Sequence, residues 1–144
     1  KRIRLLLSRQ GKMAVEAADL PVRAAGPALV RLAALPVDAD DFRLRHKTTD
    51  RAFYDQARLS AGCFEVVFVD PDGFLTEGSF TNVFVERGGQ LLTPPLSRGL
   101  LPGVLRAEMI DSGQAVEADL TAADLAGGFF IGNALRGLMP AILA

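Results

Sequence analysis

Short apolar segments separated by turn residues predict a chain built mainly from β-strands. Residues 2–7 and 13–17 form β-rich arms around a turn at 8–11, which predicts a hairpin. A strand over residues 28–35 is stopped by Pro36. The same pattern predicts further strands at residues 64–69, from 74 onward, and at 81–86, 91–93, 115–118, 129–132 and 138–143.

Turn and helix signals place most of the other segments. Turns at residues 70–73 and 87–90 predict an antiparallel meander across residues 64–93. A proline followed by a glycine opens a helix over residues 102–111, because proline lacks the N–H that the first helical turn leaves unused. A capping-box pattern predicts a short helix over residues 121–125.

The segment around Lys47 combines strand and helix signals. Residues 42–46 read as extended, and residues 48–50 supply N-cap candidates for a helix that runs to about Ala61 and ends at Gly62. We therefore expect Lys47 to lie at a strand-to-helix junction.

Composition narrows the class of protein. The 144 residues can bury a core, with 49% hydrophobic and 23% charged residues and no apolar run of membrane-spanning length, so we expect a soluble protein. A net charge of −1 gives no electrostatic footprint for nucleic acid or an anionic membrane. One cysteine, Cys63, and one histidine, His46, exclude a disulfide framework and make a poor metal site. Without a signal-peptide pattern, we expect a cytoplasmic location.

Two features bear on the chemistry. The chain begins at Lys1, without an initiator methionine and inside a predicted strand, which suggests a fragment of a longer protein. Its basic residues are 13 arginines and only three lysines, at positions 1, 12 and 47. In such a sequence a mid-chain lysine indicates a task that needs a primary amine, and imine formation is one such task.

Three motifs, far apart in the sequence, together resemble one family. They are the HKTTDR segment with its preceding arginine at residues 45–51, the TEGSFTNVF segment at 76–84, and the pair formed by residues 99–106 and 132–135. They resemble the catalytic lysine, the pyridine-nitrogen glutamate and the phosphate-binding elements of the fold-type-IV pyridoxal-phosphate enzymes, the class IV aminotransferase and 4-amino-4-deoxychorismate lyase family. The resemblance covers residues 28 to 144, and the HKTTDR and GNALRGL forms look closest to the lyases.

The resemblance implies a fold and a division of the chain. The fold class is α+β, a large cofactor-binding domain with a mostly antiparallel sheet or partial barrel and flanking helices. Residues 1–20 would be the terminal hairpin of a mostly absent small N-terminal domain. Residues 21–41 would be a connecting strand and acidic linker, and residues 42–144 the domain that binds pyridoxal 5'-phosphate.

The resemblance also implies roles for individual residues. Lys47 would be the catalytic Schiff-base lysine, and Glu77 would keep the pyridine nitrogen protonated so that the ring acts as an electron sink. The residues expected to bind the cofactor are Lys47, Arg51, Glu77, Asn82, Val104, Leu105, Asn133 and Ala134. Arg98 and Arg136 are candidates for substrate carboxylates, with solvated surface arginines as the alternative.

General chemistry supports these roles. A Schiff-base lysine must be available as a neutral amine, and Arg45, His46 and Arg51 lie close enough in sequence to lower its pKa. The amides of the helix that begins after Gly103 suit an anion. Taken alone, Lys47 could be a surface lysine at a helix start and Glu77 a polar residue at a sheet edge. Tyr54 reads as helix core or interface.

The function expected from the resemblance is a pyridoxal-phosphate lyase that converts 4-amino-4-deoxychorismate to 4-aminobenzoate and pyruvate, in the folate pathway. A branched-chain or D-amino-acid transaminase uses the same apparatus and is the alternative enzyme. A further alternative is a non-catalytic module of a larger synthase. Family members are generally homodimers, so we expect a homodimer. The resemblance includes members that are fused to or act with aminodeoxychorismate synthase.

Overall fold

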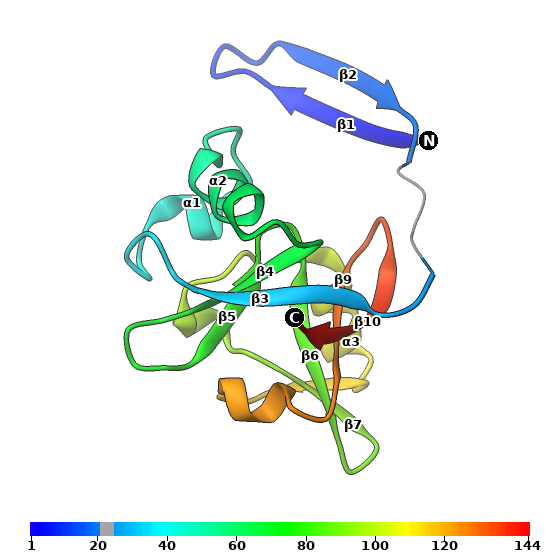
Figure 1. Cartoon of the computed structure of the whole chain (residues 1–144). Helices are drawn as coiled ribbons and strands as arrows, with labels where there is room; N and C mark the ends of the chain where they lie inside the picture. Colours follow the sequence, from blue (N-terminus) through cyan, green and yellow to red (C-terminus); the bar gives the residue numbers. More distant parts are fainter. Residues whose placement is uncertain (21–24) are drawn as a thin grey trace.

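The computed structural model describes residues 1–20 and 25–144. Figure 1 shows a curled sheet with helices on it and a separate hairpin at the N-terminus. The elements in chain order are β1 (Arg2–Leu7), β2 (Met13–Ala18), β3 (Ala28–Ala34), α1 (Phe42–Arg45), α2 (Ala52–Ala61), β4 (Glu65–Val69), β5 (Leu75–Gly78), β6 (Asn82–Arg87), β7 (Gln90–Thr93), η1 (Leu96–Arg98), α3 (Val104–Asp111), β8 (Ala115–Glu117), η2 (Ala122–Leu125), β9 (Phe129–Asn133) and β10 (Gly137–Leu143).

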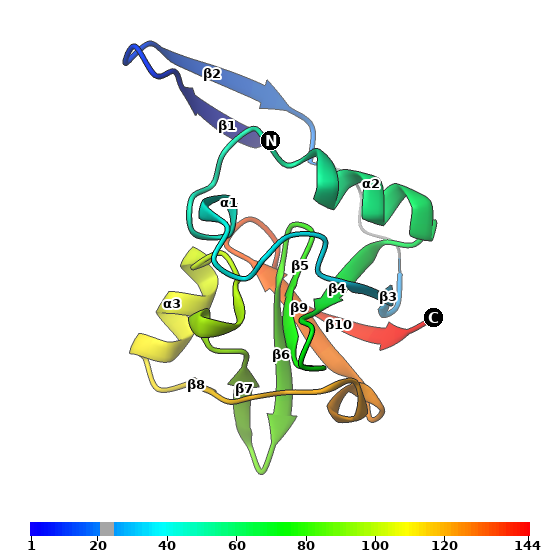
Figure 2. The same cartoon turned by 90° about the vertical axis from the view of Figure 1, so that its left-hand side faces the viewer.

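The main sheet has eight strands in the order β5-β4-β3-β10-β9-β6-β7-β8. The pairs β4–β5, β6–β7, β6–β9 and β9–β10 are antiparallel, whereas β3 pairs in parallel with β4 and β10, and β7 with β8. The sheet curls so that β5 returns to the start of β6, where the Gly78 amide donates to the Thr81 carbonyl at 2.7 Å. This partial barrel confirms the predicted α+β class (Figure 2).

Strand order corrects one expectation. The hairpins β4–β5 and β6–β7 form as predicted, but β3, β10 and β9 lie between them, so residues 64–93 are not one continuous meander. The long-range pairs of β3 and β10 decide this order, and local turn signals carry no information on it. The strand expected within residues 21–41 forms as β3 and pairs with β4 and β10 inside the large sheet. Residues 21–24 of that segment lie outside the described residues.

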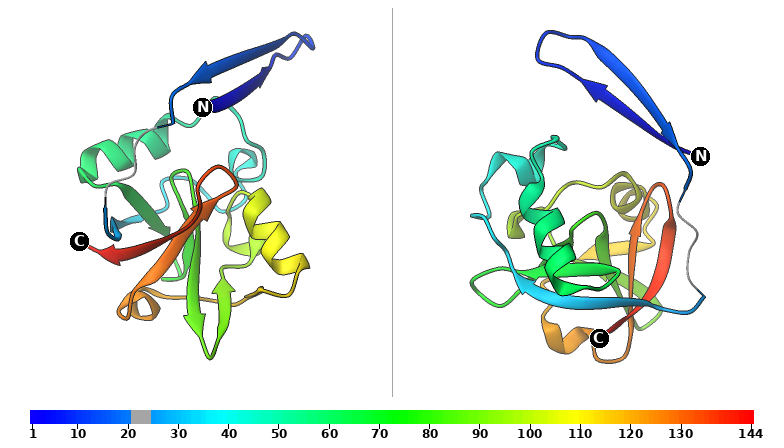
Figure 3. Two further views of the ribbon diagram at one scale, coloured as in Figure 1. Left: turned by 90° about the vertical axis from the view of Figure 1, so that its right-hand side faces the viewer. Right: turned by 45° about the horizontal axis from the view of Figure 1, so that its top comes forward.

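The hairpin β1–β2 forms with its predicted turn and makes a separate two-stranded sheet. Its register sets Leu5 opposite Val15 and Leu7 opposite Met13, which places these apolar side chains on one face. All four are at least 65% exposed. Figure 3 shows the hairpin standing away from the large sheet, beyond α1 and α2.

The core consists of three clusters of buried side chains. The largest fills the inside of the curled sheet and includes Val67, Leu75 and Ile131. A second, around Tyr54 and Phe68, packs α1 and α2 on the sheet. The third packs α3 and contains Phe84, Met109 and Ala115. The two longer helices are therefore fixed on the curled sheet at separate places.

The segment before Lys47 differs from prediction. Residues 42–45 are helical and only His46 is extended, because the Asp41 side chain accepts the Arg43 amide at 2.8 Å and caps the short helix α1. Burial of Leu44 holds this helix on the second cluster. Lys47 consequently lies in a loop between two helices.

The start of α2 also differs from prediction. Its N-cap is Arg51, which makes no side-chain capping bond, and residues 48–50 remain in the loop. The predicted end is confirmed, because Gly62 closes α2 in a left-handed conformation with φ 61°. In the described ranges, no helix has the length and apolar character needed to cross a membrane.

The αL conformation of Gly62 can be tested by substitution. We expect Gly62→Ala to lower the free energy of unfolding by about 1 kcal/mol, because a Cβ disfavours positive φ. Gly127→Ala is the matched control, since a Cβ there meets nothing within 4 Å and φ is not positive. Urea unfolding of both variants measures the difference. Equal stabilities would contradict the assignment of α2's end.

Candidate active site

The Lys47 amine is held in an electropositive setting. Partial loss of water around it lowers its pKa, and the positive charges of Arg51 and Arg4 lower it further, while Glu77 acts in the opposite direction. Of the neighbours expected to supply charge, Arg51 does so. Arg4 comes from the hairpin and could not have been predicted from local sequence. The arrangement favours a neutral amine, the form that attacks a carbonyl carbon.

Glu77 lies near the end of β5 and is 3% exposed. Burial raises its pKa to about 7, while a hydrogen bond from Tyr54 and the charge of Arg51 act to lower it. The Tyr54 hydroxyl donates to Glu77 Oε1 at 2.6 Å. Glu77 is therefore a buried carboxyl group with a fixed orientation, and not a polar residue at an exposed sheet edge.

Tyr54 is a site residue that the sequence reasoning did not identify. It is buried in the second cluster, as expected for helix core, and its ring packs on Phe68 with centroids 4.9 Å apart. Its hydroxyl, however, reaches Glu77. Helical spacing could have identified Tyr54, because Arg51 and Tyr54 are three residues apart and so share a face at the start of α2.

Arg51 joins α2 to the turn between β5 and β6. Its Nη2 donates to the Ser79 carbonyl at 3.2 Å, and its guanidinium lies 4.4 Å from the centre of the Tyr54 ring. Its Nη1 is buried and has no hydrogen-bond partner in the structure. A buried guanidinium nitrogen without an acceptor is costly, and an oxygen atom of a bound ligand would satisfy it.

The N-terminus of α3 is held open by Asn82 and Gly103. Asn82, at the start of β6, donates from Nδ2 to the Leu101 carbonyl at 3.2 Å. Gly103 is the N-cap and provides no side-chain cap, and a Cβ there would lie 1.9 Å from Asn82 Oδ1. The first amides of the helix, at Val104 and Leu105, have no acceptor within the helix and suit an anion.

Asn133 shapes the turn between β9 and β10. Its Nδ2 donates to the Phe80 carbonyl at 3.0 Å, and its Oδ1 accepts the amides of Leu135 and Arg136 at 3.1 and 3.0 Å. These bonds engage both polar atoms of the Asn133 side chain, and its predicted contact with phosphate stays a prediction. Ala134 is exposed at the tip of this turn.

The two arginines predicted to meet substrate carboxylates lie in different places. Arg98 donates to both oxygens of Asp119 at 2.8 and 2.9 Å and to Asp70 at 3.3 Å, and its guanidinium stacks over Phe74. These partners occupy it in an ion-pair network beside the β4–β5 turn, apart from Lys47. The sequence did not reveal these ion pairs because Asp119 and Asp70 are 21 and 28 residues from Arg98 in the chain.

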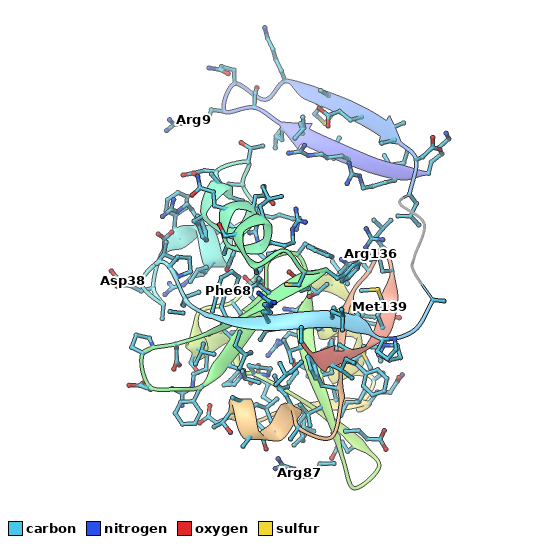
Figure 4. All side chains as sticks on the ribbon, viewed as in Figure 1. Arg9, Asp38, Phe68, Arg87, Arg136 and Met139 are labelled. Carbon is cyan, nitrogen blue, oxygen red and sulfur yellow. The ribbon has the colours of Figure 1, made fainter. Side chains whose placement is uncertain are left out.

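Arg136, by contrast, lies at the β9–β10 turn on the side of the sheet nearer the hairpin, as Figure 4 shows. It makes no ion pair with any residue in the described ranges, and its guanidinium is 5.8 Å from the centre of the Phe80 ring. The structure therefore leaves Arg136, but not Arg98, available for an anion.

Comparison with known proteins follows the same lines. The amino-transferase class IV family model matches residues 1–143. The chain belongs to the class IV aminotransferase family. It is also similar to a "Putative aminodeoxychorismate lyase" of Schizosaccharomyces pombe, 29% identical over 124 residues, which covers 82% of this chain and 54% of that protein. A "Probable branched-chain-amino-acid aminotransferase" of Thermotoga maritima is 38% identical over 55 residues, or 38% of this chain and 20% of that protein.

Solved structures agree with this family. A "Putative amino-acid aminotransferase" from Mesorhizobium loti is 42% identical, with a TM-score of 0.89 over 99% of this chain and 72% of that one. A hypothetical aminotransferase from Mycobacterium tuberculosis, solved with α-ketoglutarate and pyridoxamine 5'-phosphate bound, shares the fold at 23% identity and a TM-score of 0.78, covering 98% of this chain and 59% of that one. The chain thus spans little more than half of the S. pombe protein and a fifth of the T. maritima protein that it matches.

The site residues fit pyridoxal phosphate, the cofactor that members of this family bind. The unpartnered Arg51 Nη1, the open N-terminus of α3 and the close approach permitted by Gly103 suit its anionic oxygens. Glu77 is a buried carboxyl group whose orientation Tyr54 fixes, and the pKa of the Lys47 amine is lowered.

The raised pKa of Glu77 predicts a pH-dependent stability. A carboxyl whose pKa is higher in the folded than in the unfolded chain stabilises the fold at low pH, and this contribution is lost as pH rises from about 4.5 to about 7. We expect Glu77→Gln to reduce the loss of unfolding free energy between pH 5 and pH 8 by about 2–3 kcal/mol. Urea unfolding without cofactor measures this, and an unchanged pH slope would contradict burial of an ionisable Glu77.

The contact between Gly103 and Asn82 makes a second prediction. We expect Gly103→Ala to displace Asn82, to lower stability by about 1–3 kcal/mol, and to weaken binding of pyridoxal phosphate. Thermal unfolding and cofactor titration measure the two effects. Gly127→Ala, in open space, should change neither. Unaltered cofactor affinity in Gly103→Ala would show that the N-terminus of α3 does not bind the phosphate.

Proposed function

We propose that this chain is the cofactor-binding part of a pyridoxal-phosphate enzyme in which Lys47 holds the cofactor and acts on the amine-bearing carbon of the substrate. The observation that carries the proposal is the pairing of Lys47, whose pKa is lowered by burial and by Arg51, with a buried, oriented Glu77. Both groups come from separate elements, and Arg51 acts on both. A surface lysine at a helix start would need neither partner.

Each residue has a physical task. Lys47 would hold the cofactor through its neutral amine and, once free, would take the proton from the amine-bearing carbon of the substrate. When bound, the cofactor supplies an electron sink for the charge that develops at this carbon. Glu77 would keep the ring nitrogen protonated, and Tyr54 fixes the orientation of the Glu77 carboxyl group. Arg51 and the first amides of α3 would hold the anionic oxygens.

For the reaction, we propose conversion of 4-amino-4-deoxychorismate to 4-aminobenzoate and pyruvate. Support comes from similarity to the S. pombe protein over most of this chain, and from a 36% identity over 56 residues to the aminodeoxychorismate lyase of Bacillus subtilis, which covers 39% of this chain and 19% of that protein. The substrate carries carboxylates, and Arg136 is the arginine that the structure leaves available for one. The role in folate synthesis, a homodimer, and association with aminodeoxychorismate synthase belong to this proposal.

Amino-acid transamination is the second candidate. It is favoured by the 42% identity to the M. loti protein over nearly the whole chain. The same lysine would then return the proton to the cofactor carbon, so the described groups serve either outcome.

Covalent trapping tests the role of Lys47. After incubation with pyridoxal phosphate and reduction with borohydride, we expect peptide mapping to find the adduct on Lys47, because burial and Arg51 lower the pKa of its amine. Absorbance should show an imine band before reduction. Lys12, an exposed lysine of the hairpin turn, is the internal control, and Lys12→Arg should retain the adduct. An absent adduct, or one equally distributed over the three lysines, would favour the non-catalytic module.

The two reactions are separated by parallel assays. Supplying 4-amino-4-deoxychorismate should yield pyruvate and 4-aminobenzoate in equal amounts, and Lys47→Arg should abolish both. Exchange between a keto acid and an amino donor, without release of 4-aminobenzoate, would instead establish the transaminase.

A further inference from the structure

The turn over residues 78–81, between β5 and β6, connects the parts of the candidate site. Glu77 precedes it directly and Asn82 follows it. Its Ser79 carbonyl accepts Arg51, and its Phe80 carbonyl accepts Asn133. The positions of these four side chains, which come from α2, β5, β6 and β9, all depend on the geometry of one short turn.

Glu65, on the adjacent strand β4, binds this turn through both carboxylate oxygens. Its Oε1 accepts the Ser79 amide at 2.9 Å and the Ser79 hydroxyl, and its Oε2 accepts the Phe80 amide at 3.1 Å and the Thr81 hydroxyl at 2.9 Å. A fifth bond, from the Val66 amide to Oε1, orients the carboxylate on its own strand. The side chain is 0% exposed and pairs with no cation in the described ranges.

Packing around Glu65 leaves no room for a side chain at Gly78. A Cβ at Gly78 would lie 2.8 Å from Glu65 Oε2 and 2.4 Å from Thr81 Oγ1. All five hydrogen bonds are donated to Glu65, so both oxygens must act as acceptors, which is the ionised form of a carboxylate. Burial raises the pKa of Glu65, and the hydrogen bonds from Ser79, Val66, Thr81 and Phe80 oppose that rise.

We propose that Glu65 is a positioning residue of the active site, which fixes the turn over residues 78–81 and through the Ser79 carbonyl holds Arg51 beside Lys47. Its role in catalysis rests on the proposed function, whereas its effect on the Lys47 amine does not. Glu65 touches neither Lys47 nor Glu77 by any hydrogen bond in the structure. It acts through the backbone of the turn.

Substitution of Glu65 has two effects of opposite sign on Lys47. Removing a negative charge from the interior would by itself lower the pKa of the amine. Releasing the turn frees Arg51, and loss of its nearby positive charge raises the pKa of the amine. Of the other charged groups that act on Lys47, Arg4 comes from the separate hairpin, whereas Glu77 directly precedes the turn and is also held by the Tyr54 hydroxyl.

The experiment measures the pKa of each lysine without cofactor. Wild type, Glu65→Gln and Glu65→Asp are acetylated with a limiting reagent across a range of pH, and the extent of modification at each lysine is read by peptide mass spectrometry. The two exposed lysines, Lys1 and Lys12, serve as internal references in the same sample. We expect the midpoint for Lys47 to rise by about 0.5 pH unit or more in both variants.

The two variants distinguish the effect of the position of the turn from the effect of the Glu65 charge. Glutamine places an amide donor against the donors of the turn, and aspartate keeps the charge but is one methylene too short to reach them. An increase in both supports positioning. A lower pKa of Lys47 in Glu65→Gln with no change in Glu65→Asp would show a direct charge effect and overturn the proposal. An unchanged pKa of Lys47 in both variants would also overturn it.

Stability effects are controlled independently. Leu125→Ala removes a buried side chain from the first cluster, far from the turn, and should lower the midpoint of unfolding without moving the pKa of Lys47. Should the Glu65 variants not fold, Ser79→Ala and Thr81→Val each remove one donor to Glu65. Each should raise the pKa of Lys47 by a smaller amount. Because acetylation needs no cofactor, failure of pyridoxal phosphate to bind would contradict the proposed function and leave this result standing.

Discussion

The requirement to satisfy two buried carboxyl groups organises this molecule. Glu65 and Glu77 both lie inside the fold where β4 and β5 meet α2, and a buried carboxylate without donors is too costly to persist. The turn over residues 78–81 satisfies the first, and Tyr54 from α2 bonds to the second. The helix and the turn must therefore take their observed positions together.

The electrostatics of the site follow from that packing. Arg51 contacts the turn through Ser79 and the aromatic face of Tyr54, which places one positive charge near both Lys47 and Glu77. The same charge lowers the proton affinity of both groups. For Glu77, loss of water acts against this effect and dominates it, whereas for Lys47 the two effects act together. Arg51 thus shifts both proton affinities in the same direction, whereas burial shifts those of the amine and the carboxyl group toward each other.

Local signals in the sequence predicted what depends on nearby residues. The hairpins, the end of α2 at Gly62 and the start of α3 after Gly103 are set by turn and capping chemistry and were found as expected. Residues that act across the fold were not found this way. Sequence patterns assign Tyr54 and Glu65 only core and strand positions, and they assign Arg98 no ion-pair partner. Their partners Glu77, Ser79 and Asp119 are 14 or more residues away in the chain. The α1 helix was missed because Asp41 was read as linker.

The position of Arg4 has a consequence for the hairpin. Its charge lowers the proton affinity of Lys47, although the hairpin forms a sheet of its own. Thermodynamic linkage is reciprocal, so a proton on Lys47 must repel the hairpin as much as the hairpin disfavours that proton. The protonation of Lys47 and the position of the hairpin are therefore coupled through the charge of Arg4.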